Sequence, residues 1–453
     1  MMLFGTQRVN EVGRLEIGGC DTVDLAREFG SPLYVLDEEL IRQNCRTYVQ
    51  AFKHLYVEAE TEIAFAGKAF LSTAMCALAE SEGLSLDVAS LGEMRTACKA
   101  NYPMSRVLFH GNNRSADELE TALDFRVGRI VVDNLRELDL LDEITTRRSR
   151  NADILLRLTP GIDPHTHKLI QTGQADTKFG LNISDGSAMK GVERALAAPR
   201  IKLKGFHCHV GSQLLDTEAH EQAAIIMVGF IKEVLDRTGR IIEQLNLGGG
   251  LGIRYAESDN PPTIEEFAGR IVTIVRSELS RYGLTPPKLI QEPGRSIVGE
   301  AGATLYTIGT IKEVPITEDP GLRTYVAVDG GMSDNPRPAL YDAVYTAVVA
   351  NKANQPADWV VTICGKHCES DRLIIDAKIA KADPGDVLAV LSTGAYNYSM
   401  ASNYNRFPKP AVVLVAGGKA DLIVRRETLD DLVRNDVAPD RLRTARTPSG
   451  AGG

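Results

Sequence analysis

Short apolar runs alternate with segments of helical period between about residue 60 and residue 296. Eight runs occur, and each precedes a stretch with the period of an amphipathic helix, such as residues 71–82, 115–123 and 218–240. The runs are TEIAFAGKA, LSLDVAS, RVLFHGN, RIVVDN, DILLRLTP, LKGFHCHVGS, QLNLGGG and LIQEPGRS. Eight strand–helix units in about 240 residues match a parallel (β/α)8 TIM-like barrel in number and length. An open doubly wound sheet shows the same alternation, but no Gly-rich fingerprint follows the first strand, which favours the closed barrel.

After residue 296 the pattern changes to β-rich runs separated by turn residues. These runs are GATLYTIGTIKEV, RTYVAVDGG, DWVVTICG, DVLAVLSTGAY and AVVLVAGG, and they predict a mainly antiparallel β-sandwich or β-barrel domain. Near the N-terminus, RLEIGG and PLYVLDEE are strand-like and are expected to join the same sheet. We therefore predict a barrel domain over 36–290, a β domain over 1–35 with 291–445, and a disordered tail over 446–453.

Composition and charge narrow the class of protein. A hydrophobic content of 43% and a charged content of 25% are those of a soluble globular protein, and the net charge of -9 gives no reason to expect nucleic acid or an anionic membrane as partner. No secretory signal and no apolar stretch of about 20 residues is visible. Seven scattered cysteines do not resemble a disulfide framework, and the pair in CGKHCES lacks a second pair for zinc. We expect a cytoplasmic protein without a metal.

The ends of the eight predicted strands are unusually polar. In parallel barrels the loops after the strands converge on one mouth, so these side chains are expected to share one site. They are Lys68, Asp87, His110, Asn112, Asn134, Arg157, His207, His209, the glycines 248–250, Glu292 and Arg295.

The lysine in TEIAFAGKAFL raises a chemical question, because Lys68 ends a buried strand with no acidic neighbour nearby in the sequence. Either its amine extends to water, or the strand holds the amine for chemistry. The other polar strand ends favour the second interpretation. Desolvation in an apolar strand is then expected to lower the pKa of Lys68.

Two further motifs favour a cofactor. LNLGGGLG offers consecutive backbone N–H groups with no side chains in the way, and Ser212 of HVGSQ adds a hydroxyl; both suit a phosphate group. EPGRS brings Glu292 and Arg295 together, either as a structural salt bridge or as a carboxylate for a ring nitrogen and a guanidinium for an anion. With an aromatic ring to stack and the amine of Lys68, these features describe a pyridoxal phosphate site.

A series of motifs along the chain resembles a known family. They are GKAF, LSLDVAS, FHGNN, HTHKLIQTGQADTKFG, GFHCHVGSQ, LNLGGGLGI, EPGRS, DGGM, PRPALY, CES and TGAYNYSMASNYN. In this order they are similar to the fold-type III pyridoxal phosphate decarboxylases, and most closely to the diaminopimelate decarboxylase family, from about residue 32 to residue 426. The resemblance implies a barrel that carries the cofactor and a β domain that completes the site.

The resemblance also implies a role for each matching residue. Lys68 would be the Schiff-base lysine, His209 the residue stacked on the cofactor ring, and Glu292 the partner of the ring nitrogen. The phosphate region would be lined by Ser212, Gly249, Gly250, Gly294 and Arg295, with Tyr396 reaching cofactor and substrate and Asp87 supporting the lysine and ring. The substrate's non-reacting carboxylate would be bound by Arg295, Arg337 and Tyr341.

A head-to-tail homodimer with shared active sites is implied as well. Cys368 and Glu369 of CES would come from the other subunit, Cys368 to protonate the carbanion and Glu369 to bind the distal amine. The implied activity is that of a pyridoxal phosphate-dependent carboxy-lyase: decarboxylation of meso-2,6-diaminopimelate at its D centre to L-lysine and CO2, the last step of lysine biosynthesis. Two arginines suit a diacid, because an unpaired buried arginine facing a simple diamino acid is costly.

Three other interpretations stay open from the sequence. The first is another decarboxylase of the same fold, with ornithine, arginine, carboxynorspermidine or a carrier-bound compound as its substrate. A metal-dependent barrel hydrolase is suggested by HCH, although such sites usually have His-x-His on the first strand and Asp on the last. A catalytically silent relative would typically have lost the lysine or the cysteine, and both are present.

Overall fold

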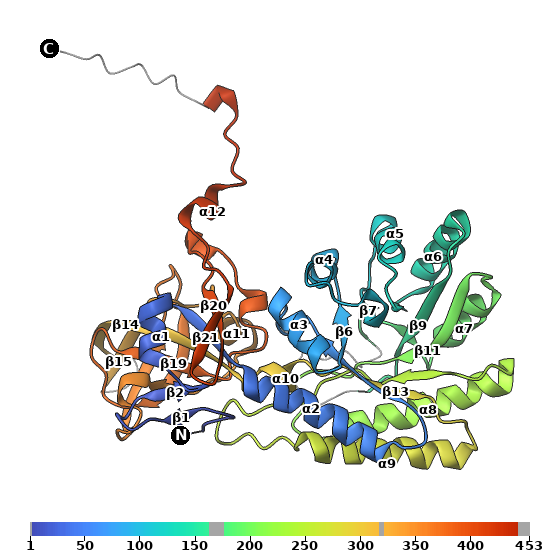
Figure 1. The fold of residues 1–453 in the computed structure, drawn as a ribbon, viewed down its shortest axis with the longest axis horizontal. Coiled ribbons are helices and arrows are strands. Elements are labelled where there is room, and N and C mark those ends of the chain that lie inside the picture. The colour runs from blue at the N-terminus through green and yellow to red at the C-terminus, as the bar shows by residue number, and fades with distance from the viewer. Residues whose placement is uncertain (1, 163–175, 317–320, 443–453) are drawn as a thin grey trace.

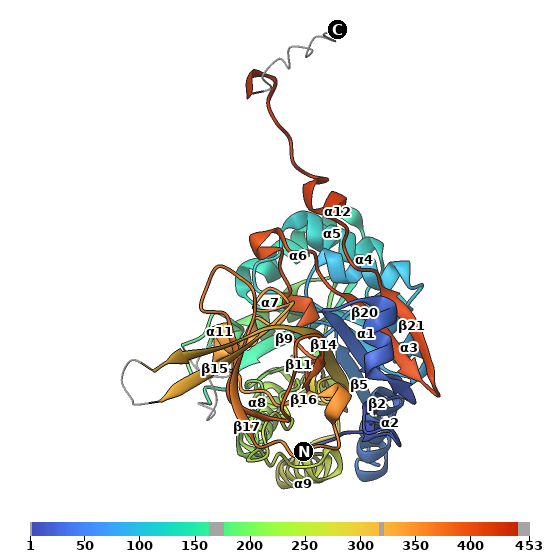
Figure 2. The ribbon, with the colours of Figure 1, turned by 90° about the vertical axis from the view of Figure 1, so that its left-hand side faces the viewer.

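The computed structural model describes residues 2–162, 176–316 and 321–442. The tail over 446–453 and the greater part of HTHKLIQTGQADTKFG lie outside the described residues. A helix-rich body and a strand-rich body lie side by side (Figure 1). Residues 429–442, which begin with α12 (Leu429–Val433), project away from the strand-rich body (Figures 1 and 2).

The eight predicted barrel strands are present, and their sheet is closed. They are β5 (Thr61–Ala66), β6 (Ser85–Val88), β7 (Val107–Phe109), β8 (Arg129–Val132), β9 (Ala152–Thr159), β11 (Ile201–His207), β12 (Gln244–Asn246) and β13 (Lys288–Gln291). Each strand pairs in parallel with the next one in this series, and β13 pairs with β5. The prediction of a closed parallel barrel is therefore confirmed, with β10 (Leu181–Asn182) added beside β9.

A helix follows each barrel strand and covers the outside of the barrel. The helices are α3 (Thr73–Ser81), α4 (Leu91–Lys99), α5 (Ala116–Asp124), α6 (Leu135–Arg148), α7 (Ser187–Ala197), α8 (Glu218–Thr238), α9 (Ile264–Tyr282) and α10 (Arg295–Val298), with α2 (Glu38–Leu55) before β5. Six of these helices begin at a residue whose side chain accepts a hydrogen bond from the first turn: Asp37, Ser72, Ser90, Ser115, Asn134 and Thr263. These short polar caps mark where each loop ends, and α9 packs against both α2 and α8.

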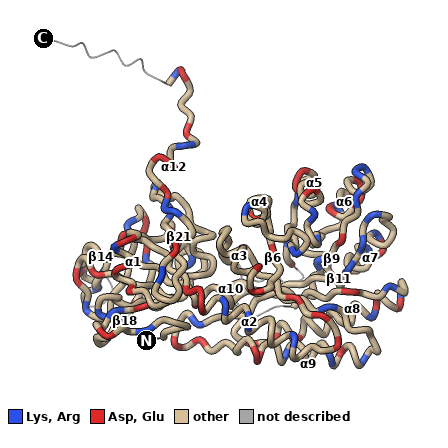
Figure 3. Tube along the Cα trace, in the orientation of Figure 1, with Lys and Arg blue, Asp and Glu red and all other residues tan. Residues whose placement is uncertain are grey.

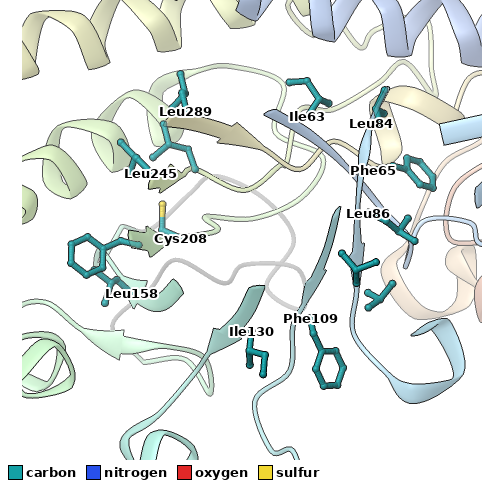
Figure 4. Packing of buried hydrophobic residues seen from close by; sticks show 14 of the residues in the cluster. Ile63, Phe65, Leu84, Leu86, Phe109, Ile130, Leu158, Cys208, Leu245 and Leu289 are labelled. Carbon is teal, nitrogen blue, oxygen red and sulfur yellow. The ribbon is translucent and has the colours of Figure 1, made fainter. Parts of the chain in front are cut away.

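The barrel strands are buried on both faces, as their continuous apolar runs require. Ala64, Leu108, Val131 and Leu155 form a cluster of their own inside the barrel. Alternate residues of the same strands point outward and pack under the helices, among them Ile63, Phe65, Phe109 and Ile130 (Figure 4). Because successive residues of a strand face opposite sides, this packing fixes which strand-end residues face the barrel axis.

The second body is a mainly antiparallel β domain, as predicted. Its sheet runs in the order β18 (Arg372–Ile379), β17 (Trp359–Cys364), β15 (Leu322–Val328), β14 (Gly302–Pro315), β4 (Leu33–Asp37), β20 (Ala411–Ala416) and β21 (Lys419–Val424). β19 (Val387–Leu391) pairs with β14 and with β16 (Ala347–Val349), and α11 (Arg337–Tyr341) follows β15. Among the described strands, β15 with β17 and β4 with β20 are the parallel pairs of this sheet.

One expectation for the N-terminal residues is wrong. PLYVLDEE supplies β4, which joins the β domain, but RLEIGG does not join that sheet. Its strand β2 (Leu15–Ile17) pairs with β1 (Arg8–Val9) and β3 (Cys20–Asp21) in a separate three-stranded sheet before α1 (Thr22–Phe29). Gly18 and Gly19 have φ values of 59° and 78°, so the chain reverses at once and pairs locally. The predicted limits of the two domains stay a prediction.

Charged residues of both signs are interspersed along the outer helices and the β domain (Figure 3). Within residues 2–162, 176–316 and 321–442, no helix combines the length and the apolar character of a membrane span.

Candidate active site

The polar strand ends meet at one mouth of the barrel. Leu108 and Leu155 face the barrel interior, so His110 and Arg157, two residues further along, face the same side. A cavity of about 460 Å³ lies there. Its lining comprises Lys68, Ala89, His110, Gly111, Asn112, Arg157, Lys178, Phe179, His207, His209, Ser212, Glu292, Arg295, Arg337, Tyr341, Tyr396 and Met400. The β domain thus closes one side of a cavity that the barrel opens.

Most of the predicted site residues line the cavity at the barrel mouth. A larger hollow of about 610 Å³ lies in the β domain, between β16 and β18. None of the predicted site residues lines it. We therefore place the site at the barrel mouth.

Lys68 follows β5, and its ammonium donates a hydrogen bond to Oδ2 of Asp87 at 3.0 Å. Asp87 is buried, whereas the lysine side chain is 43% exposed because it faces the cavity. Burial lowers the pKa of Lys68, but Asp87, Tyr396 and Glu292 outweigh burial, and the pKa is raised above its usual range. The expectation of a lowered pKa is wrong, because a carboxylate 19 residues away in the sequence contacts the amine.

Glu292 follows β13 and is the centre of a buried hydrogen-bond cluster. Its carboxylate contacts Nε2 of His110 at 2.9 Å and Nε2 of His207 at 3.1 Å, and it accepts a bond from Nδ2 of Asn246 at 2.7 Å. Burial raises its pKa, but the two histidines outweigh burial and hold the pKa of Glu292 well below its usual range. A carboxylate that stays ionised without water suits a positive charge in the cavity.

The same cluster has the spacing of metal ligands. His110, His207 and Glu292 place their ligand atoms within 4.8 Å of one another. Here the two Nε2 atoms contact the carboxylate itself rather than a common centre. Burial lowers the pKa of His207 to about 4, so its imidazole is neutral. Hydrogen bonds account for this cluster.

His209 lies two residues after the end of β11 and lines the same cavity as Lys68. Burial and the nearby ammonium of Lys68 hold its pKa well below its usual range. The ring is therefore uncharged and presents an aromatic face without a positive charge. A flat neutral ring at this position suits stacking on an aromatic ligand.

The glycine motif after β12 forms a tight turn beside Glu292. A side chain at Gly249 would place its Cβ 2.1 Å from the carbonyl oxygen of Glu292, and Gly250 has a φ of 132°. Beneath this turn, Nε2 of His220 lies 3.3 Å from the carbonyl oxygen of Gly249. Gly294 is equally constrained, since a Cβ there would lie 2.9 Å from that of Ala66. The turn therefore packs tightly against the ends of neighbouring barrel strands and has room for glycine only, with no side chain to cover its backbone N–H groups.

Three guanidinium groups border the cavity without a hydrogen-bonded carboxylate among the described residues: that of Arg157, which lies over the ring of Phe179, and the two buried groups of Arg295 and Arg337. Arg295 donates to the hydroxyl of Ser212 at 2.9 Å and to that of Tyr255, and its buried Nε has no partner. Arg337, on α11, donates to the hydroxyl of Tyr345 at 2.7 Å and lies over the ring of Tyr255. Burial lowers the pKa of Arg337, but the two tyrosines outweigh burial and raise it. Buried positive charges held only by hydroxyls and rings form a site for an anion.

Cys368 and Glu369 do not line the cavity of their own chain. They lie on the loop between β17 and β18, where both residues are exposed. Asp87, Gly249, Gly250 and Gly294 also lie outside the lining, behind or beside the residues that form it.

Sequence reasoning missed several residues of this site. Tyr255 and Tyr345 hold the two arginines, Asn246 holds Glu292, and Lys178 and Phe179 line the cavity. Asn246 is the last residue of β12, two positions before Gly248, and that position was a usable signal. The two tyrosines follow no local pattern.

The residues present fit a phosphorylated pyridine aldehyde. An amine stands beside a buried carboxylate, a neutral ring faces the same space, and Arg295 keeps a buried Nε without a partner near the glycine turn. Each group matches one part of such a cofactor: the aldehyde carbon, the ring and the phosphate.

Comparisons with known proteins agree with this chemistry. Residues 38–299 match the model of the pyridoxal-dependent decarboxylases, pyridoxal binding domain. The chain is similar to the diaminopimelate decarboxylase of Bacillus subtilis, with 49% identity over 96% of this chain and 98% of that protein. It is 50% identical to the enzyme of Bacillus methanolicus over 94% of this chain and 98% of that protein.

Solved structures of diaminopimelate decarboxylases are also similar to this chain. The crystal structure of diaminopimelate decarboxylase from M. jannaschii in complex with L-lysine superposes with a TM-score of 0.89 at 36% identity, covering 97% of this chain and all (100%) of that one. The structure of the Helicobacter pylori enzyme with L-lysine gives a TM-score of 0.82 at 30% identity, with 91% and 98% of the chains covered. The chain therefore belongs to the pyridoxal-dependent decarboxylases and, within them, to the diaminopimelate decarboxylase family.

Proposed function

We propose that this chain catalyses the pyridoxal phosphate-dependent decarboxylation of meso-2,6-diaminopimelate at its D centre, giving L-lysine and CO2. The observation that carries the proposal is one cavity shared by the Lys68 amine and two buried guanidiniums that lack a carboxylate partner among the described residues. The names of the relatives and the L-lysine bound in two solved structures support it.

Pyridoxal phosphate, when bound, supplies an electron sink for the electron pair that a departing carboxylate leaves behind. We assign Lys68 to its aldehyde and His209 to its ring face. The residues assigned to its phosphate are Ser212, Gly249, Gly250, Gly294 and Arg295, with Tyr396 beside them. Asp87 keeps the Lys68 amine in place through their 3.0 Å contact.

Glu292 is assigned to holding a proton at the ring nitrogen. Its ionised state follows from His110 and His207, whose contacts favour the carboxylate over the acid. Asn246 fixes the orientation of the same carboxylate from a third direction. A fixed negative charge in a buried site needs no reorganisation during the reaction.

Arg295, Arg337 and Tyr341 are assigned to the carboxylate of the substrate that does not react. The two arginines approach the cavity from the barrel and from the β domain, so a second carboxylate fits between the two bodies. A substrate with one carboxylate would leave at least one guanidinium buried without an anion, which is unfavourable. This arrangement favours the diacid over ornithine and arginine.

Cys368 and Glu369 are assigned to the active site of a second subunit in a cytoplasmic homodimer. Their exposure on the β17–β18 loop, away from the cavity of their own chain, supports this assignment. A thiol has an ordinary pKa of about 8.5 and serves as a proton donor when its surroundings adjust that value. Glu369 supplies a negative charge for the distal ammonium group.

The test is CO2 release by the purified holoenzyme from meso-diaminopimelate, with ornithine, arginine and lysine as controls. We expect release from meso-diaminopimelate alone, with L-lysine as the other product. Faster release from ornithine or arginine would replace the proposed substrate, and no release from any of the four would refute the proposed reaction.

A further inference from the structure

The loop between β17 and β18, residues 365–371, contains both buried and exposed residues. We call it the thiol loop. His367 and Asp371 are buried, whereas Cys368, Glu369 and Ser370 are exposed. The loop therefore has an internal anchor and an outer face that carries a thiol and a carboxylate on consecutive residues.

Asp371 provides the anchor. Its Oδ2 accepts hydrogen bonds from the backbone N–H of His367 at 3.1 Å and contacts Nδ1 of the same histidine at 2.7 Å. Its Oδ1 accepts from the backbone N–H of Met332 at 2.7 Å, in the turn after β15. One carboxylate thus joins the thiol loop to the neighbouring DGGM segment.

The backbone at two glycines lies close to the carboxylate of Asp371. A Cβ at Gly365 would lie 2.0 Å from Oδ2 of Asp371, and a Cβ at Gly331 would lie 2.2 Å from the same atom. Any side chain at either glycine would displace the carboxylate. Gly365 of CGKHCES and Gly331 of DGGM are therefore explained by one carboxylate, outside the barrel mouth.

A second segment holds the outer face of the loop. The ring of Tyr404 stacks on His367 with centroids 5.8 Å apart and an interplanar angle of 5°. Its hydroxyl donates to Oε1 of Glu369 at 2.6 Å. The side chain of the next residue, Asn405, accepts the backbone N–H of Cys368 at 3.0 Å through Oδ1. Tyr404 and Asn405 thus hold Glu369 and Cys368, which carry the carboxylate and the thiol.

We propose that Asp371, His367 and Tyr404 form a clamp that positions Cys368 and Glu369 for the reaction, with Tyr404 acting on Glu369 and Asp371 acting through His367 on Cys368. The proposal rests on the proposed function, which assigns the thiol and the carboxylate to the active site. The clamp residues are positioning residues, because their contacts are with the loop. Tyr404 thereby becomes a determinant of specificity for substrates with a distal ammonium group.

The clamp explains how exposed groups keep a defined geometry. A glutamate and a cysteine on a surface loop normally sample several rotamers. The conformational entropy lost when substrate binding orders them weakens the binding. Here one hydroxyl and one amide hold both residues within a single chain. The groups are thus ordered before they meet substrate.

Tyr404→Phe tests the outer contact. The variant keeps the ring on His367 and removes the hydroxyl that holds Glu369. We expect KM for meso-diaminopimelate to rise about tenfold while kcat and the cofactor absorbance stay within about twofold. Tyr282→Phe, at the end of α9 and far from the loop, is the matched control and should leave both constants unchanged. An unchanged KM in Tyr404→Phe, or loss of the bound cofactor, overturns the role of Tyr404.

Asp371→Asn tests the anchor with almost no change in size. We expect kcat to fall about tenfold with little change in KM, because the thiol loses its position while the binding groups remain. A second measurement needs no turnover: the rate at which iodoacetamide alkylates Cys368 in the holoenzyme, followed by peptide mass spectrometry. We expect this rate to change by about threefold or more. The half-buried Cys98 on α4 is the internal reference.

The two measurements separate the clamp from the proposed function. If the wild-type protein releases no CO2 from meso-diaminopimelate, the proposed function fails and alkylation alone decides the clamp. A changed rate at Cys368 with an unchanged rate at Cys98 supports the clamp. An unchanged rate at Cys368 in Asp371→Asn overturns it.

Discussion

The barrel mouth and the thiol loop hold their functional groups in different ways. At the barrel mouth, side chains from several strand ends face one cavity, and buried partners fix their charge, as His110 and His207 do for Glu292. On the thiol loop, two exposed residues from one turn are held by a clamp behind them. The barrel mouth faces its own chain, whereas the thiol loop faces away from it. Under the proposed function, one chain carries two parts of a site in separate places.

Replacing Lys68 removes the group on which the barrel mouth depends and has the largest expected effect. Lys68→Ala should lose the absorbance at roughly 420 nm and lower kcat by about a thousandfold or more, because no other amine among the described residues contacts Asp87. Lys178→Ala removes a second lysine of the cavity, one that lies over the ring of Phe179, and should keep the absorbance band. A band that persists in Lys68→Ala would disprove the assignment.

Mixing two inactive variants tests directly whether the two regions serve one site. Lys68→Ala lacks the barrel group and Cys368→Ala lacks the loop group, so a mixed dimer has one intact site if sites are shared. After verified subunit exchange at equal amounts, we expect activity to return to about a quarter of the wild-type value. No recovery would mean that each chain uses its own thiol loop, or none.

The arginine from the β domain distinguishes substrate binding from cofactor binding at the barrel mouth. Arg337→Ala should raise KM for meso-diaminopimelate by about 10- to 100-fold and leave cofactor content unchanged, because Arg337 contacts Tyr345 and the cavity. Arg372→Ala, an exposed arginine that contacts the hydroxyl of Tyr325, is the matched control. Parallel loss of substrate and cofactor binding would make Arg337 a structural residue.

A smaller effect concerns His220, which hydrogen-bonds no carboxylate among the described residues, unlike His367 of the thiol loop. Burial lowers the pKa of His220 to about 4. Between about pH 6.5 and about pH 4 the unfolded chain binds a proton that the folded chain does not, so the free energy of unfolding falls as pH falls, by at most about 1.4 kcal/mol per pH unit.

His220→Gln should therefore make this pH dependence shallower, since glutamine does not titrate and its amide N–H can still meet the carbonyl of Gly249. Urea unfolding across that pH range, with cofactor in constant excess, measures the slope. His54→Gln replaces an exposed histidine of α2 and should keep the wild-type slope. Identical slopes for all three proteins would contradict the effect of burial.

The sequence predicts the barrel and much of its mouth because both are encoded locally. Each strand is a short apolar run, and the first polar residue after it, such as Lys68 or Glu292, must leave the core at the same rim. The charge state of Lys68 was not predictable in this way, because its partner Asp87 belongs to another strand. Tyr255 and Tyr345 were missed for a similar reason: Tyr255 bonds to Arg295, 40 residues away in the sequence, and its ring packs against Arg337 and Tyr345 of the β domain.

The thiol loop shows a different limit. CES is visible as a motif, but nothing in the sequence links it to Tyr404 or Asn405, which lie more than 30 residues away, at separations of 35 and 37 for the two bonds. RLEIGG was misplaced because a strand of three residues pairs with whichever neighbour is near. Short strands and loop anchors depend on topology more than on local pattern.

The position of β4 has a consequence for synthesis on the ribosome. This strand lies between β14 and β20, although the whole barrel is translated between β4 and β14. At about 5–20 residues per second, the emerging strand waits for about tens of seconds before either neighbour exists. Both of its edges are open for hydrogen bonding throughout that interval. Slow codons or a late stop inside the barrel would prolong this exposure, so chaperone dependence should follow elongation speed.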